Sequence, residues 1–570
     1  MSNAALSPEN RRRALTSMAD TELDVLVIGA GVVGAGAALD AAGRGLRVGL
    51  VEARDLASGT SSRSSKLVHG GLRYLKQLHF PLVFEALRER SLILNKLCPH
   101  LAKPVEFIYP LERRGIDRVY VGAGVGVYDV LGAGRGVPSH HRHLSARKML
   151  ETFPGARKGA VHGGVKFYEG QLDDARHTMM LARTAAATGA LVATSALVTG
   201  FLRDGNRVTG AVLRDLETGQ EHEIRARRTI NAAGVWTDEL QDKAETKRQF
   251  RVRASKGVHV VVPRAAIDSR TGLITETEKS LLFIIPCPWS DDLWVIGTTD
   301  TPWQHDLAHP AATSRDIDYI LGHANRLLAK PLTRDDVVGV YAGLRPLLAG
   351  ESDDTSKLSR EHTVVTAAPG LVLVAGGKYT TYRVMADDAV NEAVKDFPRP
   401  VARSNTRDQP LLGADGYQAL WNNRANLAAN AGLEVPVLEH LLGRYGSLVH
   451  ELLDLIELDP ELAEPLTHAP RYLKAEAYYA VSHEGALHLD DILTRRLRVS
   501  VDTWDRGTES AAEVAALVGP LLGWDAETAA YEVDRYRARV EAERESQVQP
   551  DDRTADAERL GAPEARVGAR

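Results

Sequence analysis

The 570-residue sequence is short of the features that mark several common protein classes. Only two cysteines occur, Cys98 and Cys287, and neither stands in a Cys-x-x-Cys or Cys/His spacing. This argues against a disulfide framework and a metal site, and we expect reduced thiols and a cytoplasmic protein. No stretch of about 18 uncharged apolar residues occurs, so no helix is expected to span a bilayer. A formal net charge of -5, from 70 basic and 75 acidic residues, argues against nucleic acid as a partner.

Both ends of the chain are poor in residues that build a core. Residues 1–20 carry positive charge without an apolar stretch, so they are neither a secretion signal nor a membrane anchor, and we interpret them as a flexible leader. Residues 546–570 contain almost no large apolar side chain and are predicted to be disordered. Over the whole chain, 44% hydrophobic and 25% charged residues are typical of a globular protein, and the length favours two or three domains.

The strongest local pattern is a βαβ unit over residues 23–52. LDVLVI is an apolar, β-rich run, GAGVVG breaks it, AGAALDAAGRG is helical and RVGLVE is a second strand. In this context Gly29 permits a tight turn, Gly31 the close approach of a pyrophosphate, and Gly34 close helix packing. Glu52 ends the second strand, where its carboxylate suits ribose hydroxyls. A glycine-rich turn without a ligand is the alternative, and it would be the better interpretation of the glycines alone.

Two later apolar runs, TINAAG and GLVLVAGG, also end in small residues. The residues concerned are Ala233 and Gly234 in the first run and Gly376 and Gly377 in the second. Each arrangement lets a further backbone turn approach an adenine dinucleotide. The first glycine fingerprint does not separate NAD from FAD, because both present an ADP half to the same fold. Contacts from three remote regions favour a buried, resident flavin, so FAD is the predicted cofactor.

The residue periodicity changes along the chain and divides it into domains. Strand-like runs flank the turn residues 217–220 and predict a hairpin. Residues 257–300 hold the β-rich runs VHVVVP, SLLFIIP and LWVIGTTD, which predict a second sheet rather than further βαβ units. After residue 405, helical patterns broken by Gly and Pro dominate. We predict an α/β fold with an FAD-binding domain at 21–100, 165–256 and 335–405, a substrate domain at 101–164 and 257–334, and a helical domain at 406–545.

The segment SSRSSKLVHGGLRYL, residues 61–75, closely resembles the FAD-dependent glycerol-3-phosphate dehydrogenase family. Further motifs resemble the same family in the same order along the chain. YLKAE, with His483-Glu484 and Arg495-Arg496, resembles its helical C-terminal domain. The resemblance covers the chain from about residue 20 to about residue 540 and is far more specific than a glycine fingerprint. The further motifs are SKGVHVVVP at 255–263, IGTTD at 296–300, GLRPL at 343–347 and GGKYTTYR at 376–383.

The resemblance implies an FAD-binding Rossmann-like domain of the glutathione-reductase and D-amino-acid-oxidase type, an antiparallel-sheet substrate domain and a helical C-terminal domain. It implies oxidation of sn-glycerol 3-phosphate to dihydroxyacetone phosphate by hydride transfer to flavin N5, with electrons passed to a membrane quinone. Peripheral attachment to the inner face of the cell membrane also follows from it, and a homodimer is left open. Beyond the small residues and Glu52 above, the cofactor residues assigned are Thr60, Ser61, Ser64, Ser65, Lys66, His69, Gly70 and Lys378.

The residue chemistry agrees with a phosphate-bearing substrate. A phosphate monoester calls for Arg or Lys beside hydroxyl or backbone donors, and each charge-assisted hydrogen bond contributes about 1.5 to 3 kcal/mol. Arg73, Tyr74, Lys378 and Thr381 are suitable donors in or near glycine-flanked loops. Without the family motifs, Arg73 and Lys378 would each be interpreted as structural cations.

Hydride transfer from C2 also requires a base for the hydroxyl proton and a cation near the developing alkoxide. His259 is the predicted base, because the ordinary pKa of histidine is about 6.5. Arg345, in a turn between Gly343 and Pro346, is the predicted alkoxide partner. His69 is a rival base, and its alternatives are to face the flavin ring or to hold the turn that follows it.

Three other functions stay open. A glycerol-3-phosphate oxidase would use the same half-reaction and return electrons to oxygen, and the sequence barely separates the two. An amine or amino-acid oxidase of the same flavoprotein class would need a carboxylate-binding Arg but not several phosphate donors. A non-enzymatic flavin binder would keep the dinucleotide glycines but need no His or Arg at the ring.

Membrane contact rests on the resemblance more than on the residues. Residues 82–97 and 119–131 offer apolar surface, and Arg113, Arg114 and Arg118 would suit anionic lipid. An ordinary internal helix and loop explain the two segments equally well.

Overall fold

The computed structural model describes residues 4–71, 79–111, 126, 141–278, 280–349 and 361–566. Within these residues the first sheet is mainly parallel, with strand order β17-β18-β10-β1-β2-β7. Val25, Leu26 and Val27 of β1 are fully buried, as expected for a central strand that is covered on both faces. β9 and β10 form the predicted hairpin, and β8 extends it. The strands are β1 Leu23–Ile28, β2 Val48–Val51, β7 Leu191–Ala193, β8 Ala196–Asp204, β9 Arg207–Asp215, β10 Glu221–Asn231, β17 His362–Ala368 and β18 Leu371–Gly376.

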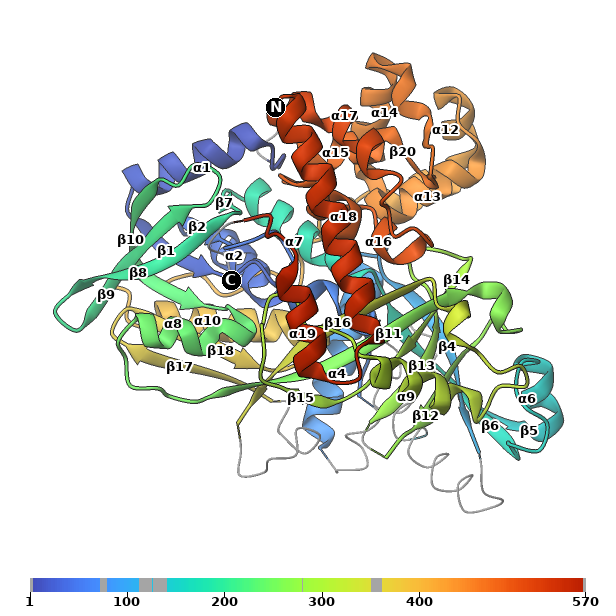
Figure 1. The fold of residues 1–570 in the computed structure, drawn as a ribbon. Helices are drawn as coiled ribbons and strands as arrows, with labels where there is room; N and C mark the ends of the chain where they lie inside the picture. The colour runs from blue at the N-terminus through green and yellow to red at the C-terminus, as the bar shows by residue number, and fades with distance from the viewer. Residues whose placement is uncertain are drawn as a thin grey trace.

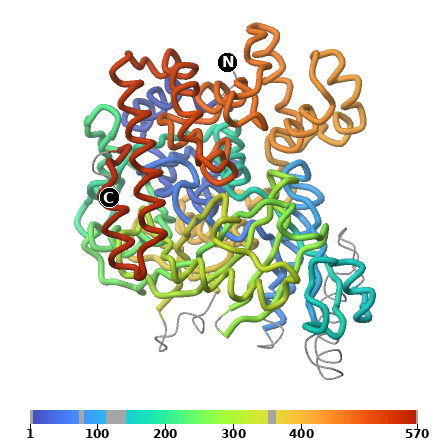
Figure 2. Tube along the Cα trace, turned by 45° about the vertical axis from the view of Figure 1, so that its right-hand side comes forward, coloured from blue at the N-terminus to red at the C-terminus, as the bar shows by residue number. Residues whose placement is uncertain are grey.

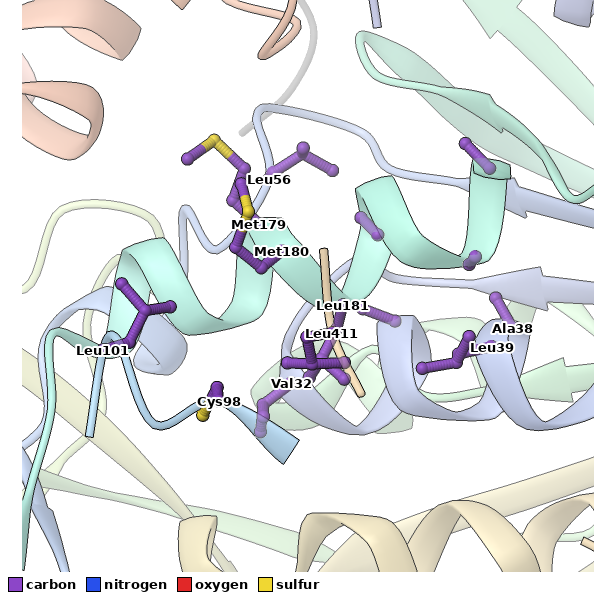
Figure 3. Packing of buried hydrophobic residues seen from close by; sticks show 14 of the residues in the cluster. Val32, Ala38, Leu39, Leu56, Cys98, Leu101, Met179, Met180, Leu181 and Leu411 are labelled. Atoms are coloured by element: carbon purple, nitrogen blue, oxygen red, sulfur yellow. The ribbon is translucent and has the colours of Figure 1, made fainter. Parts of the chain in front are cut away.

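One face of the first sheet is covered by α2 (Val32–Gly43), α7 (Asp174–Ala187) and α10 (Tyr382–Val394). Most of α2 is alanine and glycine, and these small side chains let the neighbouring helices approach closely. Figure 3 shows apolar side chains of α2 and α7, among them Leu39 and Leu181, filling the space between the two helices. This packing fixes the start of α2, where the glycine fingerprint lies.

The opposite face is covered by α1 (Pro8–Asp20) and α8 (Thr237–Lys243). Leu15 and Met18 of α1 are buried against strand residues. Arg11 is also buried, donates to the Thr194 carbonyl at 2.7 Å and forms an ion pair with Asp215. The prediction of a flexible leader is therefore wrong for residues 8–20. A short apolar stripe and one buried ion pair hold this helix against the sheet. The low number of large apolar residues in the segment gave no sign of either.

The second sheet has the strand order β15-β11-β14-β13-β12-β4-β6-β3, with β16 paired to β11 and β5 to β6. It is antiparallel except where β4 meets β12, in line with the prediction of a separate sheet. The predicted domain limits are wrong for β3, β16 and most of β6, which were placed in the FAD-binding domain, because periodicity reveals a strand but not its partner. The strands are β3 Leu67–Val68, β4 Lys103–Pro110, β5 Arg142–Ser145, β6 Gly163–Gln171, β11 Val252–Pro263, β12 Gly272–Glu276, β13 Leu281–Pro286, β14 Leu293–Gly297, β15 Thr301–Trp303 and β16 Gly339–Leu348.

The long strand β11 separates a core from a cavity. Its residues Val258, Val260 and Val262 join the apolar core that α6 (Ala146–Thr152) and α9 (Ser314–Asn325) complete. Because side chains alternate along a strand, Gly257 and His259 face the other side. The alternation therefore presents His259 to the space between the two sheets.

A helical domain follows residue 406, as predicted, and it lies at the top of the molecule in Figure 1. Its core is built from helix residues such as Leu493, Val514 and Val518. A small hairpin of β19 (Pro465–Leu466) and β20 (Ala469–Leu473) precedes α15. The helices are α11 Tyr417–Asn422, α12 Arg424–Ala431, α13 Val435–Tyr445, α14 Val449–Leu458, α15 Lys474–Ser482, the π-helix η10 Asp491–Arg496, α16 Val499–Asp502 and α17 Ala511–Leu522.

The chain ends in a pair of helices, α18 (Ala526–Val548) and α19 (Asp552–Gly561). The two red helices run side by side in Figures 1 and 2. Asp552 pairs with the buried Lys256 of β11, and Arg566 pairs with Asp491 at 2.7 Å. The predicted disorder of residues 546–570 is therefore wrong for the part that the structure describes, because charge pairs rather than apolar side chains hold this segment. Among the described helices, none has both the length and the apolar character needed to cross a bilayer.

Candidate active site

A cavity of about 460 Å³ lies between the two sheets. Its wall takes residues from the carboxyl ends of β1 and β10 in the first sheet and from β11 and β16 in the second. In open α/β sheets, ligands bind outside the carboxyl ends of the parallel strands. The cavity therefore coincides with the place that the glycine fingerprint indicates for a dinucleotide.

The first glycine turn has no room for side chains. Gly29 has a φ of +100°, and a Cβ on it would lie 2.8 Å from the Ala232 carbonyl oxygen. A Cβ on Gly34 would lie 1.8 Å from the Gly29 carbonyl oxygen, because α2 begins directly against the turn. The Val32 N–H at the start of α2 donates to Ser61 Oγ at 2.9 Å. The glycines thus keep Cβ atoms out of the turn and let a pyrophosphate approach the start of the helix.

Glu52 stands at the end of β2 beside this turn. Its carboxylate accepts hydrogen bonds from the backbone N–H of Ala30 at 2.8 Å and of Arg54 at 3.0 Å. Burial raises the pKa of the Glu52 carboxyl, and the two hydrogen bonds oppose that shift. The Arg54 guanidinium lies 4.9 Å from the centre of the Trp236 ring, and both residues line the cavity. This end combines a fixed carboxylate with a flat aromatic surface, which fits a ribose and an adenine.

The second glycine turn, at the end of β18, is equally crowded. Gly376 and Gly377 have φ values of +77° and +79°. A Cβ on Gly376 would lie 2.7 Å from the Glu361 carbonyl oxygen, and one on Gly377 would lie 2.4 Å from Met385 Sδ. Both residues and the following Lys378 line the cavity. The two turns approach one cavity from separate strands, as predicted for a dinucleotide cofactor.

His259 lies on the second-sheet side of the cavity. It is buried, its Nε2 is 2.9 Å from Ser65 Oγ, and its ring stacks on Tyr341 with centroids 4.8 Å apart. Among the described residues Nδ1 has no hydrogen-bond partner. Burial, reinforced by the cations of Arg345 and Lys66, holds the pKa of the imidazole well below its usual value. The ring is therefore neutral at physiological pH.

Arg345 lies on the same side of the cavity as His259. Its Nη2 donates to Thr298 Oγ1 at 3.1 Å, and its Nη1 is 3.9 Å from Asp300 Oδ1. A Cβ on Gly257 would lie 2.5 Å from Arg345 Nη2, so the guanidinium occupies space that only a glycine leaves open. A neutral imidazole and a guanidinium thus face one cavity, an arrangement that suits the oxidation of an alcohol carbon.

A family model described as FAD dependent oxidoreductase matches residues 24–383, and a second, described as C-terminal domain of alpha-glycerophosphate oxidase, matches residues 404–529. Glycerol-3-phosphate dehydrogenase 2 of Mycobacterium tuberculosis is 56% identical over 564 residues, covering 99% of this chain and 96% of that protein. The chain belongs to the FAD-dependent glycerol-3-phosphate dehydrogenase family.

More distant relatives of the family agree. Human mitochondrial glycerol-3-phosphate dehydrogenase is 34% identical over 539 residues, covering 91% of this chain and 73% of that protein. The structure of glycerol-3-phosphate dehydrogenase from Bacillus halodurans, complexed with FAD, superposes with a TM-score of 0.78 at 29% identity, covering 94% of this chain and 98% of that one. The predicted fold class and the FAD cofactor are confirmed.

Most site residues assigned through the glycerol-3-phosphate dehydrogenase motifs meet at the cavity. Gly34 and Gly70 are not in the cavity wall, although Gly34 shapes it from behind. The side chain of Lys66 turns away and bonds Asp174 at 2.6 Å, and the Thr381 hydroxyl bonds the Lys378 carbonyl at 3.4 Å. Arg73 and Tyr74 lie outside the described residues. The predicted residues in the wall are Gly29, Gly31, Glu52, Thr60, Ser61, Ser64, Ser65, His69, Ala233, Gly234, His259, Arg345, Gly376, Gly377 and Lys378.

Two residues beside His259 and Arg345, and one beside Arg54, were not predicted from the sequence. Thr298 lies in the cavity wall and accepts from Arg345. Tyr341 stacks on His259, and Trp236 lies under Arg54. One signal was available for Tyr341, because it stands four positions before Arg345 on the same strand and therefore on the same face. No local pattern linked Trp236 to Arg54, because the two follow different strands, β10 and β2, that lie on either side of β1.

Proposed function

We propose that this enzyme oxidises sn-glycerol 3-phosphate to dihydroxyacetone phosphate and delivers the electrons to a membrane quinone. The observation that carries the proposal is the placing of His259 and Arg345 on the cavity that the two glycine turns also line. FAD, when bound, supplies the acceptor for the hydride that leaves C2 of the substrate. The names of the relatives support the same substrate.

In this proposal His259 takes the proton of the C2 hydroxyl. Its lowered pKa keeps the ring neutral, and Nδ1 is the nitrogen without a partner among the described residues. For Nδ1 to accept, Nε2 must carry the other proton and donate to Ser65 Oγ. The positive charge of Arg345 balances the alkoxide that develops as the proton leaves.

Recognition of the phosphate is assigned to cations at the cavity. Lys378 lies in the wall directly after the second glycine turn, and its ammonium is assigned to the phosphate monoester there. Arg73 and Tyr74 keep their proposed role as further phosphate donors, and Thr381 supports the Lys378 backbone from the adjoining short helix. Several donors to one anion favour a phosphate ester over glycerol and over an amino acid.

The acceptor test separates a quinone from oxygen. Purified yellow holoenzyme, mixed anaerobically with glycerol 3-phosphate, is expected to lose its absorbance near 450 nm, whereas glycerol and D-amino acids leave it unchanged. The reduced enzyme is then mixed with a short-chain quinone or with air-saturated buffer, and the return of absorbance is timed. Fast return with quinone and slow return with oxygen supports the dehydrogenase. The reverse order identifies an oxidase, and no bleaching overturns the substrate assignment.

Membrane attachment has one supporting observation. Phe80 and Phe84, one turn apart at the start of α4 (Phe80–Leu92), are 43% and 45% exposed. Most other apolar side chains in 82–97 are buried, as in an internal helix. The three arginines at 113, 114 and 118 lie outside the described residues, as does nearly all of the segment 119–131. We propose that this aromatic pair contacts lipid on the cytoplasmic face.

Wild-type enzyme is expected to sediment with anionic vesicles at low salt and less so at high salt, and F80S/F84S to sediment less at both. Equal sedimentation of the two proteins would show that Phe80 and Phe84 do not contact the membrane.

A further inference from the structure

A buried arginine of the helical domain reaches into the loop beside the active site. Arg498 lies between η10 and α16 in a left-handed conformation with a φ of +76°. Its guanidinium donates to the Ser62 carbonyl at 3.0 Å, to Asp173 Oδ1 at 2.5 Å and to Asp174 Oδ1 at 2.7 Å. These three bonds leave the helical domain and end on residues 60–71, the serine loop, and on the start of α7.

Asp174 links Arg498 to the serine loop through two hydrogen bonds. Its Oδ2 accepts the backbone N–H of Ser64 at 2.9 Å, and its Oδ1 accepts from Lys66 Nζ at 2.6 Å. The Lys66 ammonium also bonds the Ser62 carbonyl at 2.6 Å. Arg498 and Lys66 therefore share the same two acceptors, so the loop is clamped between two cations and one carboxylate.

Ser65 stands in the middle of this clamp and faces the active site. Its Oγ is 2.9 Å from His259 Nε2. Tyr341 donates to the Ser64 carbonyl at 3.1 Å while its ring stacks on His259. The orientation of the imidazole thus depends on where residues 64 and 65 are held, and that position depends on Asp174.

We propose that Arg498 is a positioning residue, by which the helical C-terminal domain fixes the serine loop and so holds Ser65 and Tyr341 against His259. Arg498 acts through Asp174 and Ser62 and touches neither substrate nor cofactor. Removing its charge takes from the buried Asp173 and Asp174 a cation that pairs with both, so the loop must rearrange. The inference rests on the proposed function only through the role of His259.

The test compares two buried arginines in the same domain. Arg535 pairs with Glu532 one turn away within α18, at 2.6 Å, so R535M removes a buried ion pair without touching the serine loop. R498M is expected to lower the anaerobic rate of flavin bleaching by glycerol 3-phosphate about 10- to 100-fold at saturating substrate, with a smaller change in KM. R535M is expected to lower the melting temperature without that loss of rate. R498K, which keeps the charge, is expected to restore part of the rate and covers the case in which R498M does not fold.

A double-mutant cycle with His259 decides between positioning and general damage. If Arg498 acts through His259, then R498M and R498K lower the bleaching rate of wild-type enzyme but change little in H259N enzyme, whose base is already absent. Equal losses in both backgrounds, or a loss no larger than that of R535M, would overturn the inference. A wild-type enzyme that does not bleach would instead overturn the proposed function, so the two failures are distinguishable.

Discussion

The glycine turn at one end of the cavity and the His259 wall at the other are held in place by different means. At the glycine end the contacts are backbone contacts, and a single added carbon meets a carbonyl oxygen at 1.8 Å. At the histidine end they are side-chain contacts between distant parts of the chain. Ser65 and His259 are 194 positions apart, and Asp174 and Arg498 are 324 apart. At the glycine turn an added carbon therefore meets backbone that cannot move away, whereas the histidine wall depends on the charge and orientation of side chains.

Substitutions at the two ends should therefore produce different losses. A change in the glycine turn alters the shape of the cofactor site, so it should be seen as loss of bound flavin. A change at the histidine wall should leave the protein yellow and slow its reduction. The expected effects follow from the largest to the smallest.

Gly34→Ala should have the largest effect on activity, because enzyme that has lost its flavin cannot oxidise substrate at all. Its Cβ would lie 1.8 Å from the Gly29 carbonyl oxygen, so α2 must shift. We expect flavin affinity to fall about 100-fold, equivalent to about 3 kcal/mol, and the protein to purify almost colourless. The ratio of absorbance at 280 and 450 nm, followed by titration with FAD, measures this. Gly322→Ala is the matched control, because that glycine lies in α9 with open space at its Cβ position. Full flavin content in G34A would show that the turn tolerates a Cβ at residue 34.

His259→Asn should keep the flavin and slow its reduction by glycerol 3-phosphate about 100- to 10,000-fold, the usual contribution of a general base. Stopped-flow bleaching under anaerobic conditions measures the rate. His69→Asn is the comparison, because His69 also lines the cavity and its backbone is held by Thr380 through hydrogen bonds of 3.1 and 3.2 Å. A larger loss in H69N than in H259N would make His69 the base.

Arg345→Met should slow reduction about 100- to 1,000-fold, because the developing alkoxide would lose its cation in a buried site. Arg345→Lys keeps the charge but not the planar bond to Thr298, so its loss should be smaller. Steady-state kinetics with a soluble quinone give kcat and KM for both. Arg251→Lys, an exposed position just before β11, serves as the control. If R345M changed only KM, Arg345 would bind substrate without stabilising the alkoxide.

The smallest effect concerns pH and three buried histidines, of which only His259 lines the cavity. Burial lowers the pKa of His100 and of His177 to about 3, and holds that of His259 well below its usual value. Below about pH 6.5 these histidines bind protons in the unfolded chain, where their pKa is near 6.5, but stay neutral in the folded protein. The free energy of unfolding should therefore fall as pH drops below about 6.5, by up to about 1.4 kcal/mol per pH unit for each such histidine.

Melting temperatures of the holoenzyme from pH 7.5 to pH 5 test this sign. His177→Gln should flatten the slope by removing one of the three groups, whatever it does to stability at pH 7.5. An unchanged slope would show that His177 takes up protons in the folded state.

Local patterns determined much of this protein. The spacing of Gly29, Gly31 and Gly34 after a buried strand fixed the βαβ turn, because strand, turn and helix are adjacent in sequence and their sterics are local. The motifs also singled out His259 and Arg345, whose place on the cavity wall follows from strand alternation once β11 and β16 are paired.

The tertiary structure alone decided the rest. Periodicity did not reveal that β6 and β16 join the second sheet, that α1 and α19 are ordered, or that Lys66 turns from the cavity to Asp174. Each depends on a partner far along the chain, and several on buried ion pairs such as Arg11–Asp215 and Arg498–Asp174. From the sequence alone, an isolated charged residue is expected to be exposed to solvent. Only the fold shows that an opposite charge is buried beside it.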